Sequence, residues 1–289
     1  MVGQASAQIM EDGRRLHLQH GPIDIMAEAF GAEDEVQAAY HQGAQFFETV
    51  LQSLVIDLDF LRKPVDGKIL PELGLISQQM WHAAYRVSEG RFVTPMAAVA
   101  GAVADAVLAS MAKGRDLQKL YVNNGGDIAL YLNDNARFVG GVVNNQDAPD
   151  IDACFELTSA DNVGGIATSG WRGRSLSPGI ADAVTVLAKT SALADVAATI
   201  IAGDVWVENT AIKQEPAKTI RDDTDLGDMP VTIFVGNLDE KSRSNALENG
   251  LKTATSLYQS GLIDGAYLAL QGDVRSLSSM TKYIQREVA

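Results

Sequence analysis

The sequence predicts a mixed α/β (α+β) fold in which sheets are backed by helices, and three observations support this prediction. Apolar residues recur at helical spacing in some segments and alternate at strand spacing in others. Strand-like and helix-like segments follow one another with no Pro-rich or Ser-rich linker between them. Of the 289 residues, 46% are hydrophobic and 21% are charged, as in ordinary globular proteins. We therefore expect a single compact domain over residues 1–289.

The first half of the chain is predicted to combine strands with three helices. Short β-like runs surround a Gly21-Pro22 turn in residues 14–30. An amphipathic helix is predicted after Gly31. The acidic residues 33–35 mark its start, because they complement the positive end of the helix dipole. The remaining segments of this half are a helix at 73–88, a helix that begins after Thr94-Pro95, and strands at 117–122, 127–132 and 137–143.

The second half is predicted to continue in the same mixed pattern. Residues 213–229 are acidic and polar with little periodicity, which favours an acidic loop or hinge. The other segments are a strand at 153–157, a Gly-rich stretch at 163–170, a strand at 183–188, an Ala-rich helix at 191–201, a strand at 231–235, a helix near 240–258 and a strand at 266–270.

Charge, cysteine content and hydropathy exclude several classes of protein. Acidic residues outnumber basic ones by 37 to 23, so the formal net charge is −14 and we expect no nucleic-acid partner. The lone Cys154 cannot form an internal disulfide or a multi-cysteine metal site. The apolar stretch 97–112 is shorter than the roughly 20 residues that span a bilayer, which favours a buried helix. With no secretory signal pattern at the N-terminus, we expect a cytoplasmic protein without a membrane partner.

The familiar catalytic templates do not occur in the chain. The sequence contains no P-loop, no G-x-G-x-x-G after a strand, no H-E-x-x-H and no G-x-S-x-G. Function must therefore be sought in less specific patterns.

The first such pattern is the glycine pair Gly125-Gly126, followed by Asp127, between two predicted strands. Paired glycines let the backbone approach a ligand closely or adopt positive φ, and the aspartate can accept hydrogen bonds. An ordinary hairpin explains the same residues equally well.

The second pattern is the segment 164–174, where small residues present successive backbone N–H groups and the hydroxyls of Thr168 and Ser169. Arg172 and Arg174 follow them directly. Amides in a nest and guanidinium groups both donate to anionic oxygens, so the segment suits a phosphate or pyrophosphate. The alternative is a surface loop with solvated arginines.

The third pattern is the pair Asp195 and Thr199 on a predicted helix. Residues four apart lie on one side of a helix, where both oxygens can reach one hard cation. The alternative is an aspartate in a first turn and a threonine that bonds its own backbone.

A weak internal echo links these patterns. Residues 124–129 (NGGDIA) resemble residues 163–167 (VGGIA), and each stretch neighbours an Ala-rich helix with one aspartate, Asp105 or Asp195. Either duplicated halves or chance matching of Gly and Ala explains the echo.

In chain order, N-x-G-G-D-I, A-T-S-G and A-D-x-x-A-T resemble the motifs of the ApbE-type FAD:protein FMN transferases, Mg²⁺-dependent enzymes that attach FMN to a protein threonine. Residues 101–105 (GAVAD) are similar to that family's K-G-x-x-x-D helix. The similarity covers residues 94–203 and implies a T-fold-like arrangement of mixed sheets backed by helices.

The resemblance also implies site residues, with Asp195 and Thr199 as the Mg²⁺ ligands. The family's Lys is Ala100 here. From their proximity in sequence, we expect Arg172 and Arg174 to be the catalytic residues that replace this cation and stabilise the pyrophosphate oxygens. The flavin nucleotide, FAD or FMN, would lie against Gly125, Gly126, Asp127, Thr168, Ser169 and Gly170.

Other departures from the family leave three functions open. The family's H-I-x-D-P-x-T-G segment appears here as residues 174–179, which keep Pro178 but lack the His and Asp. The leading hypothesis is a protein that binds a flavin nucleotide or related diphosphate with Mg²⁺ and acts as an FMN or phosphoryl-type transferase on a protein acceptor. The alternatives are a non-catalytic flavin or nucleotide carrier and a structural homo-oligomer.

Overall fold

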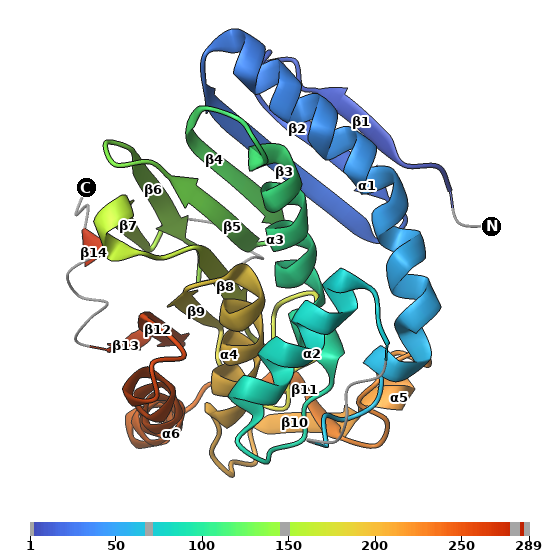
Figure 1. Ribbon diagram of the computed structural model, residues 1–289. Helices are drawn as coiled ribbons and strands as arrows, with labels where there is room; N and C mark the ends of the chain where they lie inside the picture. Colours follow the sequence, from blue (N-terminus) through green and yellow to red (C-terminus); the bar gives the residue numbers. More distant parts are fainter. Residues whose placement is uncertain (1–2, 67–71, 145–150, 278–283, 286–289) are drawn as a thin grey trace. The chain divides into compact units, whose positions relative to one another are not determined.

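The computed structural model describes residues 3–66, 72–144, 151–277 and 284–285 (Figure 1). Contacts between residues group the chain into two compact units. The mixed α/β class is confirmed within each unit, and the single domain expected over residues 1–289 stays a prediction. Unit 1 comprises Met1–Phe138, Leu157–Ala167 and Ala188–Asp195, and unit 2 comprises Val139–Glu156, Thr168–Leu187 and Val196–Ala289.

Unit 1 is built on an antiparallel sheet with the strand order β1-β2-β3-β4-β5-β8. The strands form where apolar residues alternate, and in β2 the side chains of Leu16, Leu18 and His20 are buried while Gln19 between them is exposed. The strands are β1 (Ser6–Ile9), β2 (Leu16–His20), β3 (Ile23–Gly31), β4 (Leu117–Asn124), β5 (Asp127–Leu132) and β8 (Gly165–Ser169), of which Gly165–Ala167 belong to unit 1.

The helices α1 and α3 pack side by side on one face of this sheet, and α2 packs against both (Figure 1). Gly43 of α1 makes the close crossing with α3 possible, because a Cβ there would lie 2.6 Å from Cγ of Met111. The four helical segments are α1 (Glu33–Leu61), α2 (Leu75–Ser88), η1 (Pro95–Ala98) and α3 (Val99–Ala112), and the short η2 (Ser159–Asp161) also lies in unit 1.

The stretch Pro95–Ala112 is apolar and long enough to cross a membrane by length and composition alone. In unit 1 its α3 part packs against β4 and β5, and the side chains of Ala102, Val103 and Val107 are fully buried. The sequence prediction of a buried helix is therefore confirmed.

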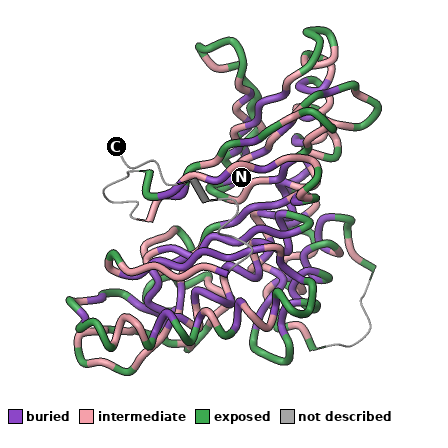
Figure 2. The backbone as a smooth tube through the Cα atoms, turned by 90° about the vertical axis from the view of Figure 1, so that its left-hand side faces the viewer, coloured by how far each residue is buried: buried purple, intermediate pink, exposed green. Residues whose placement is uncertain are grey.

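Unit 2 contains antiparallel strands and three helices. β9 pairs with β12, and every residue of both strands is buried. Most of these residues are apolar, and Thr185 of β9 is a buried polar residue. Figure 2 shows several stretches of backbone that are buried along their length. The strands are β6 (Arg137–Val142), β7 (Ala153–Thr158), β9 (Ala183–Ala188), β10 (Ile212–Pro216), β11 (Pro230–Val235), β12 (Gly265–Leu270), β13 (Asp273–Ser276) and β14 (Ile284–Gln285); the helices are α4 (Ser191–Asp204), α5 (Ala217–Ile220) and α6 (Glu240–Gln259). The chain passes between the units within β6, β7, β8, β9 and α4.

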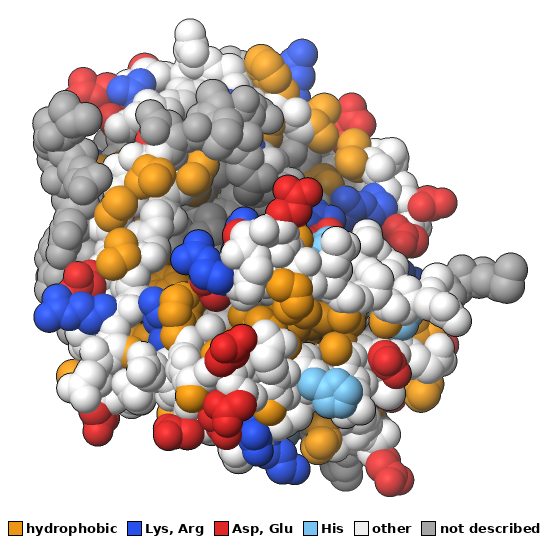
Figure 3. Space-filling view, turned by 90° about the horizontal axis from the view of Figure 1, so that it is seen from above, with side chains coloured by type: hydrophobic (Ala, Val, Ile, Leu, Met, Phe, Trp, Pro, Cys, Tyr) orange, Lys and Arg blue, Asp and Glu red, His pale blue; other side chains and the backbone are white. Residues whose placement is uncertain are grey.

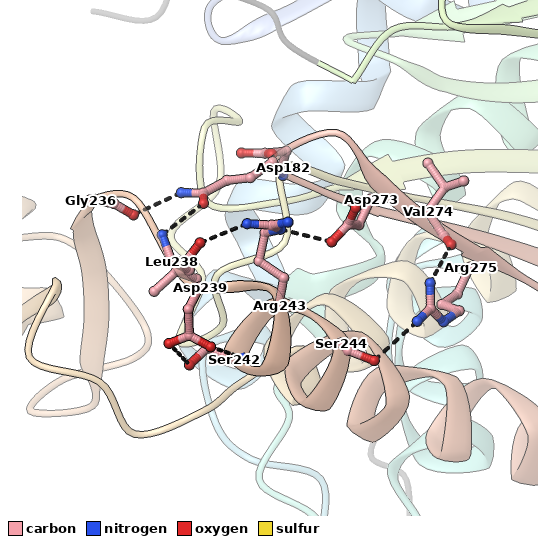
Figure 4. A network of polar contacts seen from close by, with 11 residues as sticks. Asp182, Gly236, Leu238, Asp239, Ser242, Arg243, Ser244, Asp273, Val274 and Arg275 are labelled. Atoms are coloured by element: carbon pink, nitrogen blue, oxygen red, sulfur yellow. Dashed lines mark hydrogen bonds and ion pairs between the residues drawn. The ribbon is translucent and has the colours of Figure 1, made fainter.

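The first turn of α6 is fixed by a polar network (Figure 4). Asp239 caps the helix by accepting a hydrogen bond from the Ser242 N–H at 2.9 Å. Nε of Arg243 forms an ion pair with Asp273 of β13 at 2.7 Å. The Gln271 side chain donates to the Gly236 carbonyl and accepts from the backbone N–H that precedes the cap. The strand–helix–strand end predicted for the chain is thus confirmed. Hydrogen bonds and an ion pair connect the start of α6 to the neighbouring residues 236 and 271–273.

The loop or hinge expected at 213–229 is shorter than predicted. Residues 213–216 lie in β10, which pairs with β11, and α5 follows directly. Residues 221–229 are the part that lies outside helix and strand. The side chains of β10 are mostly exposed, so the strand carries little hydrophobic alternation and resembles a loop in sequence.

Surface charges of both signs are interspersed over the molecular face seen in Figure 3. Several acidic residues form ion pairs in the part of the chain that the structure describes. Lys218 pairs with Asp228 at 2.6 Å, and Nε of Arg275 pairs with Glu248 at 2.9 Å. Exposed pairs of this kind each contribute about 0–1 kcal/mol to stability.

Candidate functional site

The Gly125-Gly126 pair forms a two-residue hairpin turn between β4 and β5. Asn124 and Asp127 are partners across the hairpin, and both glycines have positive φ, 69° and 112°. Oδ1 of Asn123 accepts a hydrogen bond from the Gly126 N–H at 2.8 Å. The hairpin interpretation therefore accounts for both glycines, and Asp127 begins β5 beside this exposed turn.

The first turns of α3 and α4 exchange aspartate caps within unit 1. Oδ2 of Asp195, on α4, accepts a hydrogen bond from the Gly101 N–H of α3 at 3.0 Å. In the other direction, the two carboxylate oxygens of Asp105, on α3, accept from the N–H groups of Ser191 and Ala192 at 2.9 Å each. Each aspartate thus satisfies backbone donors that a helix start leaves without an intrahelical partner.

Two further residues tighten this contact between the helices. A Cβ at Gly101 would lie 2.4 Å from the Ser191 carbonyl oxygen, so the approach of the two turns requires glycine. Nδ2 of Asn124 donates to the Ala100 carbonyl at 3.1 Å, which connects the end of β4 to the start of α3. The turn at 125–126, α3 and the first turn of α4 therefore meet in one polar cluster.

The carboxylates of this cluster are destabilised in their charged form. Burial raises the pKa of Asp195 well above its ordinary value, and the nearby charges of Asp127 and Asp105 raise it further. Burial also raises the pKa of Asp105 to about 6, although its two N–H donors act in the opposite direction. Asp195 as a whole residue is partly exposed, while its carboxylate is desolvated and accepts backbone N–H groups.

The oxygen donors of this cluster fit a hard divalent cation. A cation would offset the burial and repulsion that raise the pKa of Asp195, because it favours the charged carboxylate. Thr199, four residues further along α4 and in unit 2, is partly exposed. In the described part of the chain, no group of three or more His, Cys, Asp or Glu residues could hold a metal ion. The donor set instead suits Mg²⁺, which uses one or two carboxylates and completes its shell with water and phosphate.

The second glycine-rich segment is a strand rather than the predicted loop. Gly165 and Ile166 pair with β5, so residues 165–169 belong to β8 and their backbone follows the sheet. A nest of free amides over these residues is therefore wrong. Glycine occurs there because a Cβ at Gly165 would lie 2.1 Å from the Ser191 nitrogen.

The end of β8 lies in unit 2 and carries three predicted flavin-site residues. Oγ1 of Thr168 lies 2.8 Å from Oγ1 of Thr185, while Ser169 is half-buried. Gly170 is buried, and a Cβ there would lie 2.4 Å from the Asp182 carbonyl oxygen. Their assignment to a nucleotide site stays a prediction.

The two arginines after β8 differ in their surroundings. Nε of Arg172 forms an ion pair with Asp182 at 3.0 Å, and its guanidinium lies 4.5 Å from the centre of the Trp171 ring. Arg174 is exposed, and its carbonyl oxygen accepts from Nη2 of Arg221 at 3.3 Å. A catalytic role for either arginine stays a prediction, and Arg172 already has an anionic partner within unit 2.

The structure adds one residue that the sequence did not assign to the site. Two signals in the sequence pointed to Asp105: its match to the Asp of the family's K-G-x-x-x-D pattern and its similarity in context to Asp195. A pocket of about 520 Å³ lies elsewhere in unit 1. It is lined by Gly3, Gln4, Ala5, His20, Glu48 and Gln52, none of them a predicted site residue.

Comparison with known families gives one match over most of the chain. A family model described as "AbpE bacteria" matches residues 7–276. Among curated relatives, a UPF0280 protein of Methanosarcina acetivorans is 34% identical over 122 residues, 42% of this chain and 47% of the relative. A UPF0280 protein of Methanospirillum hungatei is 31% identical over 180 residues, 62% of this chain and 70% of the relative. The match to the first of these spans about half of that relative's length.

Solved structures give a more distant similarity. The apo flavinyl transferase ApbE of Pseudomonas stutzeri is 14% identical with a TM-score of 0.45, over 98% of this chain and 96% of that one. An ApbE protein of Thermotoga maritima is 10% identical with the same TM-score of 0.45, over 99% of this chain and 100% of that one. Scores of this size give no residue correspondence.

Proposed function

The chain belongs to the family described as AbpE bacteria, and on this basis we propose that it binds a flavin nucleotide, or a related diphosphate, together with Mg²⁺. We further propose that it acts as an Mg²⁺-dependent transferase of the FMN or phosphoryl type. Within unit 1, Asp195 is assigned to the cation, and the turn at 125–126 with Asp127 to the flavin nucleotide. The assignments of Thr199, Thr168, Ser169 and Gly170, which lie in unit 2, rest on the sequence resemblance alone.

The observation that carries this proposal is the environment of Asp195. Burial and the neighbouring Asp127 and Asp105 raise its pKa, while the structure gives it backbone N–H donors rather than a Lys or Arg in the described residues. The backbone hydrogen bonds of Asp195 offset only part of the cost of burying a carboxylate that has no cationic partner among the described residues. A divalent cation removes that cost, which favours a binding role over a structural one.

The residues of the chain have distinct roles in the proposed reaction. Asp195 holds the cation from its first-turn position on α4, and Asp127 adds negative charge beside it. The exposed Gly125-Gly126 turn leaves room for the nucleotide, since no atom lies within 4 Å of a Cβ at Gly126. Bound Mg²⁺ supplies neutralisation of the charge that develops on the diphosphate.

The transfer itself breaks one P–O bond and forms another. The bond between the FMN phosphorus and the bridging oxygen of FAD breaks, and AMP leaves with that oxygen. A bond forms from the same phosphorus to the acceptor hydroxyl oxygen, whose proton is released to solvent.

The test is to incubate the purified chain with FAD and Mg²⁺ and to measure AMP together with protein-bound FMN. We expect AMP release that Asp195→Asn abolishes and that the control Asp239→Asn, at the α6 cap, leaves unchanged. The proposal fails if the wild type neither binds flavin in the presence of Mg²⁺ nor releases AMP.

A second candidate is a carrier that binds the same ligand without cleaving it. It is favoured by Ala100, which stands where the related enzymes have Lys and whose carbonyl oxygen is held by Asn124. In the same experiment, flavin bound in an Mg²⁺-dependent manner without AMP release identifies the carrier.

A further inference from the structure

We propose that Asp105 is a positioning residue for Asp195: it holds the first turn of α4 in place and thereby sets where the Asp195 carboxylate lies. This inference rests on the proposed function, in which Asp195 binds the divalent cation. Asp105 is assigned a positioning role because both of its oxygens accept backbone N–H groups at the start of α4.

The contacts of Asp105 are long-range and use the whole carboxylate. It lies 86 residues from Ser191 and 87 from Ala192, and it meets their two N–H groups at 2.9 Å each. Oγ1 of Thr190 also accepts a hydrogen bond at this helix start, from the Leu193 N–H at 3.2 Å. Asp105 therefore fixes the backbone of Ser191 and Ala192, the first two residues of α4, through their N–H groups.

Close packing around Ser191 restricts the position of the first turn of α4. A Cβ at Gly101 would lie 2.4 Å from the Ser191 carbonyl oxygen, and one at Gly165 would lie 2.1 Å from the Ser191 nitrogen. Glycine on both sides lets α3 and β8 approach the Ser191 backbone closely. The turn is thus held by close packing on two sides and by charge-assisted hydrogen bonds from Asp105.

A change at Ser191 is transmitted to Asp195 because both lie within the first turns of one helix. Four residues of an α-helix span about 6 Å of continuous hydrogen-bonded backbone. Asp195 in turn accepts from the Gly101 N–H, so displacement of α4 also changes this contact. Partners that orient a metal ligand in this way typically affect metal affinity 10–100-fold.

Charge alone offers a competing explanation, because the charge of Asp105 also acts on Asp195. Two substitutions separate the explanations. Asp105→Asn keeps the length of the side chain but removes its charge and one acceptor oxygen. Asp105→Glu keeps the charge but adds a methylene, so the carboxylate cannot meet both N–H groups from the same backbone position.

The experiment measures Mn²⁺ affinity of the full-length chain at pH 7.5 by electron paramagnetic resonance, with thermal unfolding measured in parallel. Mn²⁺ is the probe because it prefers the same oxygen ligands as Mg²⁺. Asp239→Asn and Asp239→Glu are the matched controls, because Asp239 also accepts an N–H at a helix start but lies in the α6 network.

We expect both Asp105 variants to weaken Mn²⁺ binding by about tenfold or more, and both Asp239 variants to bind as the wild type does. If only Asp105→Asn weakens binding, charge is the cause and the positioning role is overturned. If both Asp105 variants keep wild-type affinity while their melting temperatures fall, Asp105 is structural only and the proposal is likewise overturned.

The wild type and Asp195→Asn distinguish failure of this inference from failure of the proposed function. Wild-type binding that Asp195→Asn abolishes supports the cation site, whatever the Asp105 variants show. Wild-type protein without Mn²⁺ binding overturns both proposals. Should neither Asp105 variant fold, Asp105→Ser, which keeps one acceptor oxygen at this position, is expected to give the same tenfold loss, and wild-type affinity would overturn the role.

Discussion

The two glycine pairs of the sequence echo, at 125–126 and 164–165, look alike in sequence but serve different physical purposes. Gly125 and Gly126 are exposed, and their positive φ values form the hairpin turn. The pair at 164–165 has no such φ, and a Cβ on either residue would lie within 2.4 Å of a backbone atom of residues 189–191. Glycine is favoured at the first pair by conformation and required at the second by close packing.

The aspartates of the two echoed helices differ in a similar way. Asp105 uses both oxygens to hold α4, whereas Asp195 has one oxygen recorded on Gly101 and partial exposure. The two similar sequence patterns therefore differ in structure. The glycine pair at 164–165 makes close packing contacts and Asp105 accepts hydrogen bonds with both oxygens, whereas the pair at 125–126 is exposed and Asp195 is partly exposed. The open features, the turn at 125–126 and Asp195, are those assigned to the ligand.

The largest effect is expected from Gly165→Ala. Its Cβ would lie 2.1 Å from both the Ser191 nitrogen and the Thr190 carbonyl carbon, and neither backbone atom belongs to a flexible side chain. Overpacking of this kind should lower the free energy of unfolding by about 3 kcal/mol, measured by urea denaturation. A loss below about 1 kcal/mol would contradict the packing half of the comparison.

The next effect concerns the pH dependence that Asp105 gives to stability. Its pKa is about 6 in the folded chain against an ordinary 3.8, so between these pH values the folded state binds more protons than the unfolded state. The free energy of unfolding should therefore fall by about 2 kcal/mol as pH rises from about 4 to about 6.

Asp105→Asn should remove this part of the pH dependence, as measured by urea midpoints at each pH. Asp12→Asn is the control, because the pKa of Asp12 is lowered by its hydrogen bonds to Arg14 and Arg15 and it is ionised throughout this range. An unchanged slope in Asp105→Asn would show that Asp105 does not titrate there.

A smaller effect is expected from Gly126→Ala. No atom lies within 4 Å of its Cβ, so the cost comes from a φ of 112° that L-residues rarely adopt. We expect a loss of about 1–2 kcal/mol in the free energy of unfolding. A loss as large as that of Gly165→Ala would contradict the difference between a conformational cost at Gly126 and a packing cost at Gly165.

The smallest effect is expected from Gly125→Asn. The φ of 69° at this position is one that asparagine tolerates, and the residue is exposed. The free energy of unfolding should change by less than about 0.5 kcal/mol in the same urea titration. A larger loss would indicate that the turn needs glycine for a reason besides its φ.

Local patterns made most of the elements predictable from the sequence. Helix α1 follows from its acidic first turn and its apolar stripe, and α3 from a long Ala-rich segment. Strands β2 to β5 follow from alternation and turn residues. These signals lie within a few residues of the structure that they specify, so no knowledge of distant contacts is needed.

Four features depend on residues outside their own segment and could not be predicted. The strand at 165–169 was interpreted as a loop because its glycines serve contacts with residues 189–191. The Asp105 cap joins residues 86 apart, and Arg172 is paired with an aspartate of another segment. Strand β10 is stabilised mainly by pairing with β11 rather than by burial of its own side chains.

The hydrogen bond between Asp195 and Gly101 also has a consequence for the order in which the chain is made. Unit 1 includes Ala188–Asp195, so roughly two thirds of the chain must leave the ribosome before its last segment emerges. Until then the Gly101 N–H at the start of α3 lacks its Asp195 acceptor. The Ser191 backbone, against which Gly101 and Gly165 pack, has also not yet been synthesised. Folding of unit 1 during translation can therefore be completed only after most of unit 2's early segments have been synthesised.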